Sequence, residues 1–391
     1  MKKTKKKLML IGMYGSGSAG DDAILQSIFE AFPEYAITIT QGGYFDIGKR
    51  LGVKSIFCRM YEGISLRVFF SVLMSSFKIL GCLLSADALM YGGGSLIHDL
   101  SAYNLPFLFF WHAAALLFRK PVIYLGIGIG PVQTNLGRKL CRFFLSRAML
   151  LFVRDSRGKE ICESLGVRGA ILSHDVVFLQ AGKLAPDHVL LSELGLRERQ
   201  FVAVSGCAWF HTDNYWAGKK SFEEEIKNYA DCLHAVHDAV GLPLVFAATN
   251  KHDYALGDHL KQYFSQEAFL LLPNTLDHVE LQQIFASGQM TIGVRMHSMI
   301  FTANALRPFF GIVYDEKVSQ LLQQTKTGTY SMLIEQMTPD LLKPKIEAFL
   351  RDFELITHSL QGIIPAFQSD LERNVAMIKT CIETGKPSEL A

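Results

Sequence analysis

The stretch Leu8–Leu25, LMLIGMYGSGSAGDDAIL, decides the fold class because it contains a strand, a glycine turn and a helix start in that order. The apolar run at residues 8–11 predicts a buried strand, and residues 23–32 predict a helix. Gly15 and Gly17 between them predict a tight turn with backbone at positive φ. A strand, a turn and a helix in this order open a parallel α/β sheet.

The same turn also matches the glycine fingerprint of dinucleotide-binding proteins, over residues 15–20. Two features count against a bound pyrophosphate. Asp21 and Asp22 lie where the helix is predicted to begin, and a carboxylate there takes the N–H groups and dipole end that a phosphate needs. The second predicted strand, residues 35–40, ends in Thr40-Gln41-Gly42-Gly43, with no Asp or Glu there to hold a ribose. We therefore interpret the turn as structural and expect no cofactor.

The pattern of strand, glycine turn and helix recurs along the first half of the chain. Short, continuous apolar runs predict the strands, as a sheet covered on both faces requires. These runs occupy residues 8–11, 35–40, 87–91, 121–126, 149–153 and 170–173. Glycine and polar residues follow them, at the carboxyl ends where such sheets bind ligands.

A polar connection at about residues 181–200 separates this half from a second alternating half. The second half has predicted strands at residues 201–205, 242–248, 268–272, 290–294 and 309–313. We expect an α/β protein with two doubly wound, Rossmann-like domains facing a cleft. The predicted domains are residues 1–185 and 200–340, followed by a helical tail, residues 341–391, that can cross back to the first domain.

Composition restricts the class of protein. With 391 residues, 49% apolar and 19% charged, the chain is expected to be globular. A formal charge of +2 without aromatic-basic interleaving predicts no nucleic-acid partner. Seven cysteines without a C-x-x-C pair predict reduced thiols in a cytoplasmic protein. The sequence contains no P-loop, H-E-x-x-H or G-x-S-x-G motif. We find no partner at metal spacing for His211, His234, His237 or His259, and we expect no metal.

Two apolar runs, residues 68–84 and 105–118, raise the question of membrane contact. Lys78 interrupts the first, and the second opens with Pro106 and contains His112. Neither run provides the roughly 18 uninterrupted apolar residues that a membrane-spanning helix needs. We favour two buried helices. The alternative is a peripheral membrane protein, one side of which binds the inner face of a membrane with the help of its N-terminal lysines.

Two glycine turns of the first half are candidates for a binding site. Three glycines directly after a predicted strand could expose backbone N–H groups to phosphate or carboxylate oxygens, or simply form a turn. These are Gly92, Gly93 and Gly94, with His98 and Asp99 following as a titratable pair. A later glycine turn, Gly126-Ile127-Gly128-Ile129-Gly130, lets a sugar or another backbone approach closely.

Arg154 lies at the end of a predicted strand, before a helix that Asp155 or Ser156 is expected to cap. A guanidinium at this place can bind an anion through a bidentate fork, or form a structural ion pair. Both alternatives are compatible with the residues.

The turn Gly293-Val294-Arg295-Met296-His297-Ser298 is the most informative in the second half. Arg295 and His297 combine a fixed positive charge with a proton carrier at the start of a new helix. This combination favours an anion site with acid–base chemistry over a purely structural turn, and we expect Ser298 to join the anion site.

Taken in order, GMYGSGSAGDDAIL, YGGGSLIHD, GIGIGP, VRDSRG, SHDVVF and GVRMHSMIFTANALRPFFGIVYDEKV resemble the polysaccharide pyruvyltransferase family, from residue 8 to about 320. The resemblance implies a fold similar to GT-B glycosyltransferases, with phosphoenolpyruvate as co-substrate. The acceptor would be a sugar of a cell-surface polysaccharide or its lipid-linked precursor, and the product a pyruvate ketal.

The resemblance also implies roles for individual residues. Arg295 and His297 would act in donor binding and catalysis, and Arg154 would join Arg295 and Ser298 in binding the donor. The acceptor or backbone anion site would lie in the first domain, at Gly15, Gly17, Asp21, Gly92, Gly93, Gly94, His98, Asp99 and Gly128. Two other functions are kept open: a GT-B glycosyltransferase that uses a nucleotide sugar, and a non-catalytic polysaccharide-assembly protein.

Overall fold

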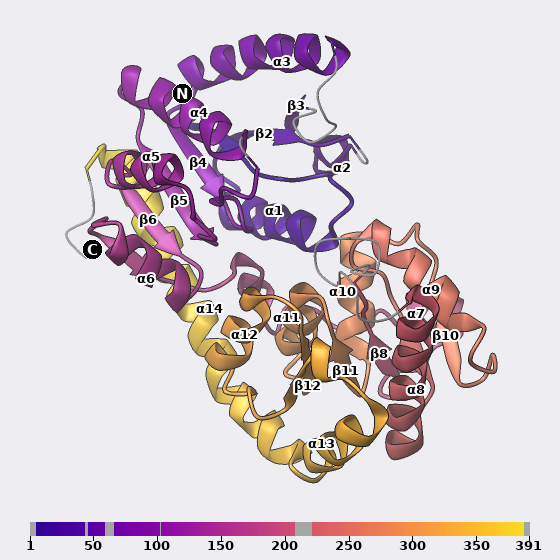
Figure 1. Cartoon of the computed structure of the whole chain (residues 1–391). Helices are drawn as coiled ribbons and strands as arrows, with labels where there is room; N and C mark the ends of the chain where they lie inside the picture. Colours follow the sequence, from indigo (N-terminus) through magenta and orange to yellow (C-terminus); the bar gives the residue numbers. More distant parts are fainter. Residues whose placement is uncertain (1–4, 44–45, 59–65, 102, 208–220, 387–391) are drawn as a thin grey trace. The chain divides into compact units, whose positions relative to one another are not determined.

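The computed structural model describes residues 5–43, 46–58, 66–101, 103–207 and 221–386, with the backbone alone for residues 66–73. The chain forms two compact units (Figure 1). The first contains residues 1–179 and 367–391, and the second contains residues 180–366. The last helix, α14 (Phe353–Thr384), therefore begins in the second unit and ends in the first.

The first unit is built on a parallel sheet of seven strands in the order β3-β2-β1-β4-β5-β6-β7. The strand order reverses between β1 and β4, which makes their carboxyl ends the switch point where open α/β sheets bind ligands. The strands are β1 (Lys7–Ile11), β2 (Ala36–Gln41), β3 (Lys54–Phe57), β4 (Ala88–Gly92), β5 (Val122–Ile127), β6 (Leu150–Val153) and β7 (Ala170–Leu172).

Helices cover both faces of this sheet (Figure 1). One face carries α3 (Leu66–Ser85), α4 (Asn104–Leu117) and α5 (Asn135–Leu145), whose inner side chains share one buried cluster with strand residues. The other face carries α1 (Ala19–Ala31) and the end of α14, which Lys379 ties to Glu34 at 2.7 Å. The remaining helices are α2 (Ile47–Leu51) and α6 (Ser156–Ser164).

The second unit has a parallel sheet of six strands in the order β10-β9-β8-β11-β12-β13, with its switch point between β8 and β11. Its strands are β8 (Val202–Val204), β9 (Leu244–Phe246), β10 (Phe269–Leu271), β11 (Met290–Gly293), β12 (Phe309–Val313) and β13 (Ser331–Leu333). Its helices include α7 (His188–Glu193), α8 (Phe222–Val240), α9 (Tyr254–Lys261), α10 (His278–Ser287), α11 (Met296–Asn304), α12 (Glu316–Gln324) and α13 (Pro339–Arg351). Two parallel α/β units confirm the predicted fold class.

Three local predictions differ from the structure. β3 and β13 were not predicted, because short edge strands leave only a few apolar residues in the sequence. The first helix begins at Ala19 rather than at residue 23, and Ser18, not an aspartate, caps it by accepting from the Asp21 N–H. The expectation that Asp21 or Asp22 caps this helix is therefore wrong.

The two apolar runs form α3 and α4, which are buried on one side only. Ile79 and Leu83 of α3 and Leu108 and Trp111 of α4 lie in the core, whereas Phe77 and Phe110 are exposed. Among helices built from described residues, none combines the length and apolar character needed to traverse a bilayer. The expectation of two buried helices therefore holds for the inner sides of α3 and α4 and is wrong for their outer sides.

Candidate functional site

Four polar side chains meet at the carboxyl edge of the second unit's sheet. Ser205 follows β8, Asp253 follows β9, Arg295 follows β11 and Tyr314 follows β12. These strands are neighbours in the order β9-β8-β11-β12, so their carboxyl ends bring the four turns together at the switch point. The predicted Arg295 turn thus lies where a doubly wound sheet places ligands.

Arg295 is held by a buried carboxylate. Its Nε and Nη2 atoms donate to Oδ2 and Oδ1 of Asp253, each at 2.8 Å. The Asp253 side chain is 0% exposed and that of Arg295 is 26% exposed. Burial acts to lower the pKa of Arg295, but the hydrogen bonds and charge of Asp253 raise it above its usual value. The guanidinium therefore stays charged, with one edge fixed toward the interior.

The other edge of Arg295 lies beside Tyr314 and a second cation. Arg295 Nη1 donates to the Tyr314 hydroxyl at 3.4 Å. The Lys317 ammonium lies 5.4 Å from the centre of the Tyr314 ring and 3.1 Å from the Asp315 carboxylate. Burial acts to lower the pKa of Lys317, but Tyr314 and Asp315 raise it overall. Two positive charges consequently flank one tyrosine.

Two buried serines set the shape of the Arg295 turn. Ser205 Oγ accepts hydrogen bonds from the backbone N–H groups of Val294 and Arg295, at 3.1 and 3.3 Å. Ser298, 0% exposed, shares a 2.7 Å hydrogen bond with Ser205 and donates to the Arg295 carbonyl at 2.6 Å. No side chain caps α11 at Arg295, and within this first turn the Ser298 N–H donates to the Arg295 carbonyl at 3.1 Å. The structure thus gives Ser298 contacts that shape the turn.

His297 lies in the first turn of α11 and is half-buried. Its ring centre is 6.1 Å from that of Phe301, and its Nε2 atom is enclosed by protein. Cys207 follows β8, close enough to Arg295 and Asp253 for their charges to act on its thiol, and burial raises its pKa to about 11. A thiol with such a pKa is protonated at neutral pH and is a weak nucleophile.

The glycine turn after β1 adopts the predicted positive φ, at 67° for Gly15 and 89° for Gly17. The Gly15 N–H donates to Asp22 Oδ1 at 2.7 Å, and a Cβ added at Gly94 would lie 3.1 Å from Asp21 Oδ1. These carboxylates place negative charge at the turn. Their position disfavours an anion there and favours a ligand that donates hydrogen bonds, such as a sugar hydroxyl.

The backbone N–H groups of the three glycines at the end of β4 are not all available to a ligand. Gly93 and Gly94 have positive φ, 63° and 72°, but the Gly93 N–H donates to the Leu125 carbonyl of the neighbouring strand at 2.8 Å. Gly92 belongs to β4, and its carbonyl accepts from the buried Tyr14 hydroxyl at 2.8 Å. The interpretation as a turn therefore accounts for Gly92 and Gly93.

Arg154 is 5% exposed and lies among protein groups of the first unit. Its guanidinium is 3.5 Å from both the Asp155 and the Asp175 carboxylate, and donates to Ser95 Oγ at 3.2 Å. These contacts match the structural alternative of the sequence analysis. Its assignment to the donor stays a prediction. Asp155 also caps α6, as expected.

Gly128 allows this arginine to approach the backbone. A Cβ at Gly128 would lie 2.8 Å from Arg154 Nη2 and 3.2 Å from Ser95 Cα. Gly128 also donates to the Gly94 carbonyl at 2.8 Å, so its close neighbours are another backbone and a guanidinium. The close approach of each neighbour requires that residue 128 has no side chain.

Replacing Gly128 by alanine is expected to destabilise the chain by about 1–3 kcal/mol, the usual cost of overpacking a filled site. Gly81→Ala is the matched control, because nothing lies within 4 Å of its added Cβ and it is in the helix α3. Calorimetric melting of both variants checks the prediction, which fails if Gly128→Ala melts at or above the temperature of Gly81→Ala.

The described contacts of His98 and Asp99 are with other residues rather than with each other. The Asp99 carboxylate accepts from the backbone N–H groups of Gln133 and Thr134 at 2.6–2.9 Å and from the Thr134 hydroxyl at 2.7 Å. Burial acts to raise the pKa of Asp99, but these hydrogen bonds outweigh it and lower the pKa. The Asp99 side chain anchors the loop that precedes α5, and the His98 carbonyl accepts from Asn104 at 3.0 Å.

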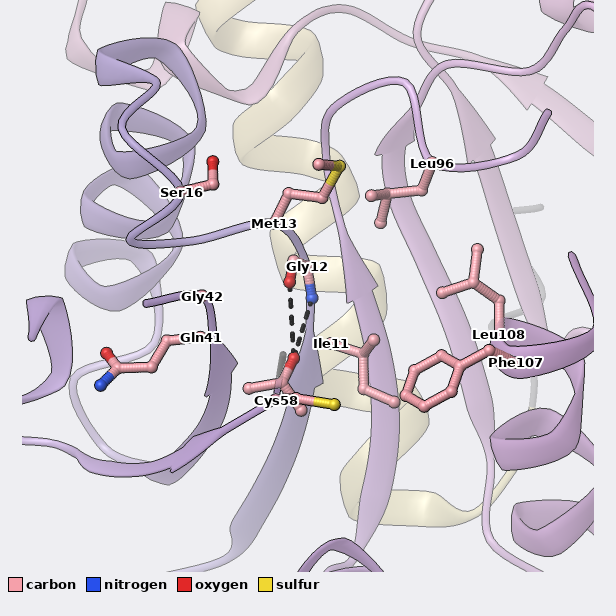
Figure 2. Close-up of a pocket in the computed structure, with 11 residues that line it drawn as sticks. Ile11, Gly12, Met13, Ser16, Gln41, Gly42, Cys58, Leu96, Phe107 and Leu108 are labelled. Carbon is pink, nitrogen blue, oxygen red and sulfur yellow. Dashed lines mark hydrogen bonds between the residues drawn. The ribbon is translucent and has the colours of Figure 1, made fainter. Parts of the chain in front are cut away.

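A small cavity of ≈ 30 Å³ lies at the switch point of the first unit (Figure 2). Its lining includes Gly12, Gln41, Cys58, Leu96 and Phe107 (Figure 2). These residues come from the segment after β1, from β2, from the segments after β3 and β4, and from α4. Burial raises the pKa of Cys58 to about 11. The cavity has room for roughly one water molecule. It is too small for a sugar ring.

The sequence analysis missed Asp253 and Ser205, and left Tyr314 and Lys317 aside. Asp253 lies in a polar run after β9, Asn250-Lys251-His252-Asp253, whose position at a strand end was the available signal. Ser205 directly follows β8, with the same signal. Nothing in the sequence pairs Asp253 with Arg295, 42 positions away.

Comparison with known proteins adds a family and a fold. The family described as "Polysaccharide pyruvyl transferase" matches residues 19–316 of this chain. The chain is also 23% identical, over 397 aligned residues, to the amylovoran biosynthesis protein AmsJ of Erwinia amylovora. That alignment covers 90% of this chain and 93% of AmsJ.

Solved structures resemble the whole chain at low identity. The putative UDP-N-acetylglucosamine 2-epimerase of Listeria monocytogenes has a TM-score of 0.65 at 14% identity, with 99% of each chain covered. Anabaena Alr3699/HepE, in complex with UDP and glucose, has a TM-score of 0.62 at 10% identity, covering 96% of this chain and 99% of that one. A glycosyltransferase of Rickettsia africae has a TM-score of 0.60 at 8% identity, covering 98% and 100%. These similarities show a GT-B-like fold.

Proposed function

Because this chain belongs to the polysaccharide pyruvyl transferase family, we propose that it transfers pyruvate from phosphoenolpyruvate to a sugar of a cell-surface polysaccharide or its lipid-linked precursor, forming a pyruvate ketal. The similarity to an amylovoran biosynthesis protein supports an acceptor of the polysaccharide class. The single observation that carries the donor assignment is the bidentate Asp253–Arg295 pair at the switch point.

The reaction balances without a cofactor. A proton adds to the methylene carbon of phosphoenolpyruvate and gives a methyl group, while one sugar hydroxyl attacks the central carbon and loses its proton. The bond from that carbon to the phosphate oxygen then breaks, and a second hydroxyl of the same sugar closes the ketal with loss of its proton. The products are the pyruvylated sugar and inorganic phosphate.

Phosphoenolpyruvate carries a phosphate and a carboxylate, so its site needs several positive or N–H groups. We assign the outer edge of Arg295, the Lys317 ammonium and the uncapped start of α11 to these oxygens. All three belong to the second unit. The Tyr314 hydroxyl, 3.4 Å from Arg295 Nη1, orients the guanidinium edge that meets the donor.

The two carboxylates near these cations act differently in this proposal. Asp253 is 0% exposed and holds Arg295 through two hydrogen bonds, so an incoming anion does not displace it. Asp315 is 34% exposed and holds the Lys317 ammonium through one ion pair, while its other oxygen accepts from the Lys317 backbone N–H. A donor phosphate can replace Asp315 beside Lys317, because this pair is only half-buried and is held by a single contact between the side chains.

We assign His297 to one of the proton transfers. Its Nε2 atom is enclosed by protein, so Nδ1 is the nitrogen that we assign to the substrate. Ser298 acts on the donor indirectly, by holding the Arg295 turn through Ser205. We place the acceptor in the first unit, where Asp21 and the glycine turns suit sugar hydroxyls better than anions. That the two sites share one cleft stays a prediction.

Arg295→Lys is expected to raise the KM for phosphoenolpyruvate by about ten- to a hundredfold, because an ammonium cannot reproduce a planar, bidentate fork. The conservative exchange Arg351→Lys, at a residue whose side chain is 74% exposed, is the control and should leave KM unchanged. Steady-state release of phosphate gives both values. An Arg295→Lys variant with the KM of the wild type contradicts the assignment.

The proposed reaction is tested by phosphate release from phosphoenolpyruvate with and without a lipid-linked saccharide acceptor. We expect release that requires the acceptor and a product that gains the mass of pyruvate less one water. A chain that consumes a nucleotide sugar instead is a glycosyltransferase of the same fold. A chain that binds neither donor, by calorimetric titration, is an assembly protein, and either result overturns the proposal.

A further inference from the structure

The outer faces of α3 and α4 carry apolar side chains at helical spacing. On α3 these are Met74, Phe77 and Leu84, with Gly81 between them. On α4 and the residue before it they are Tyr103, Phe110 and Leu117, with Pro106 and Ala113 in register. Phe77 is 64% exposed, Phe110 59% and Leu117 78%. Steps of three and four residues align each set along one side of its helix.

These stripes are not isolated exposed residues of the kind common on protein surfaces. α4, NLPFLFFWHAAALL, contains no Lys, Arg, Asp or Glu, and its His112 is buried. A helix that is apolar on all sides is ordinarily covered on all sides. Here the sheet covers only the inner side, through Leu105, Leu108 and Trp111.

Both helices lie on one face of the first unit. Ile79 and Leu83 of α3 belong to the same buried cluster as the inner residues of α4. α5 continues this layer, since Phe144 stacks on Phe109 at 4.7 Å, and its Leu136 and Phe143 are exposed. Figure 1 shows α3 and α4 on the side of the sheet opposite α1. We name the outward surface of these three helices the α3–α5 face.

The chain around the α3–α5 face has a strong excess of positive charge, although the whole chain has 39 Lys and Arg against 37 Asp and Glu. Exposed cations on or next to its helices include Lys78, Arg119 and Arg147. Among the described side chains from residue 54 to 147, the cations are Lys54, Lys78, Arg119, Lys120, Arg138, Lys139, Arg142 and Arg147, against the acids Asp87 and Asp99. Asp87 and Asp99 accept hydrogen bonds from backbone N–H groups.

We propose that the α3–α5 face docks on the surface of an anionic phospholipid bilayer. Aromatic and aliphatic side chains of α3 and α4 enter the region between headgroups and acyl chains, while the cations around them meet lipid phosphates. Helices that lie on a bilayer fit the absence of a spanning helix among described residues. A second copy of the chain is a poorer occupant, since self-pairing would bring cation-rich faces together.

This inference goes beyond the proposed function and does not depend on it, because docking is measured without substrate. The test is cosedimentation of the full chain with vesicles of phosphatidylglycerol and phosphatidylcholine in equal parts, and with vesicles of phosphatidylcholine alone. We expect binding to the anionic vesicles that weakens as salt is raised. Absence of binding to the anionic vesicles overturns the proposal.

Variants locate the surface. Phe77→Gln with Phe110→Gln should lower the partition coefficient at least about tenfold, and Lys78→Gln with Arg119→Gln about fivefold per charge. The matched controls Leu333→Gln with Leu355→Gln, and Lys261→Gln with Lys343→Gln, change exposed residues of the second unit and should bind like the wild type. Equal losses in controls and face variants contradict the assignment to this face.

Circular dichroism and melting of each variant show whether it folds, and exposed positions are expected to tolerate these changes. Sedimentation equilibrium without lipid measures the oligomeric state and tests whether the α3–α5 face is instead an interface between copies of the chain. If the wild type forms dimers that Phe77→Gln with Phe110→Gln abolishes, the α3–α5 face is an interface between copies, and membrane docking is rejected. A chain that stays monomeric while it binds anionic vesicles supports the proposal.

Discussion

His297→Ala is expected to lower kcat for pyruvyl transfer by about 10²- to 10⁴-fold, the usual contribution of a general acid or base. The side chain lies in the first turn of α11, two residues from the arginine assigned to the donor. If His297 moves a proton and does not bind the donor, KM for phosphoenolpyruvate should change little. Single-turnover release of phosphate, in the presence of acceptor, measures the chemical step directly.

His358→Ala serves as the control, because His358 is exposed on α14 and lies outside the site. Its rate should equal that of the wild type. A His297→Ala variant within a few-fold of the wild type would show that another group carries the proton. A variant with unchanged kcat and raised KM would instead place His297 among the groups that bind the donor.

Asp253→Asn is expected to destabilise the chain by about 3 kcal/mol, because it leaves the partly buried Arg295 charge without its carboxylate. The amide keeps the size of the side chain, so the loss reports charge rather than a cavity. The same substitution should also raise the KM for phosphoenolpyruvate, since two hydrogen bonds no longer fix the guanidinium of Arg295.

Asp315→Asn is the matched control for this change. Asp315 also pairs with a cation of the site, but it is 34% exposed, and asparagine can keep its role as the cap of α12. Its expected cost is below about 1 kcal/mol. Calorimetry measures the melting temperature of both variants. Equal values would mean that the buried Asp253–Arg295 pair contributes no more than the half-buried Asp315–Lys317 pair.

Much of the fold could be predicted from the sequence, because local pattern and secondary structure agree in most elements. The predicted strand at residues 290–294 corresponds to β11, and Asp155, one of the two predicted caps, caps α6. The predictions failed where the local signal was weak. β13 has three residues and lies at the edge of its sheet, so pairing with β12 rather than its own sequence defines it.

The candidate site was predicted only in part. The Arg295 turn was found because it combines a strand end, a cation and a helix start in six consecutive residues. The role of Asp253 was not predicted, because it depends on a hydrogen bond with Arg295, which lies 42 positions away in the sequence. The placement of Arg154 against Asp155 and Asp175 likewise required the fold, since an arginine at a strand end suits an ion pair and an anion site equally.

By itself, the sequence determined the α/β class, the two alternating halves and the positions of the glycine turns, because periodicity and backbone preference act over a few residues. Tertiary structure alone decided which charges meet. The order of the strands brings Asp253 to Arg295 and Asp21 to Gly94, and it leaves one side of α3 and α4 uncovered. These are contacts between distant segments, and their energies depend on burial that no local stretch encodes.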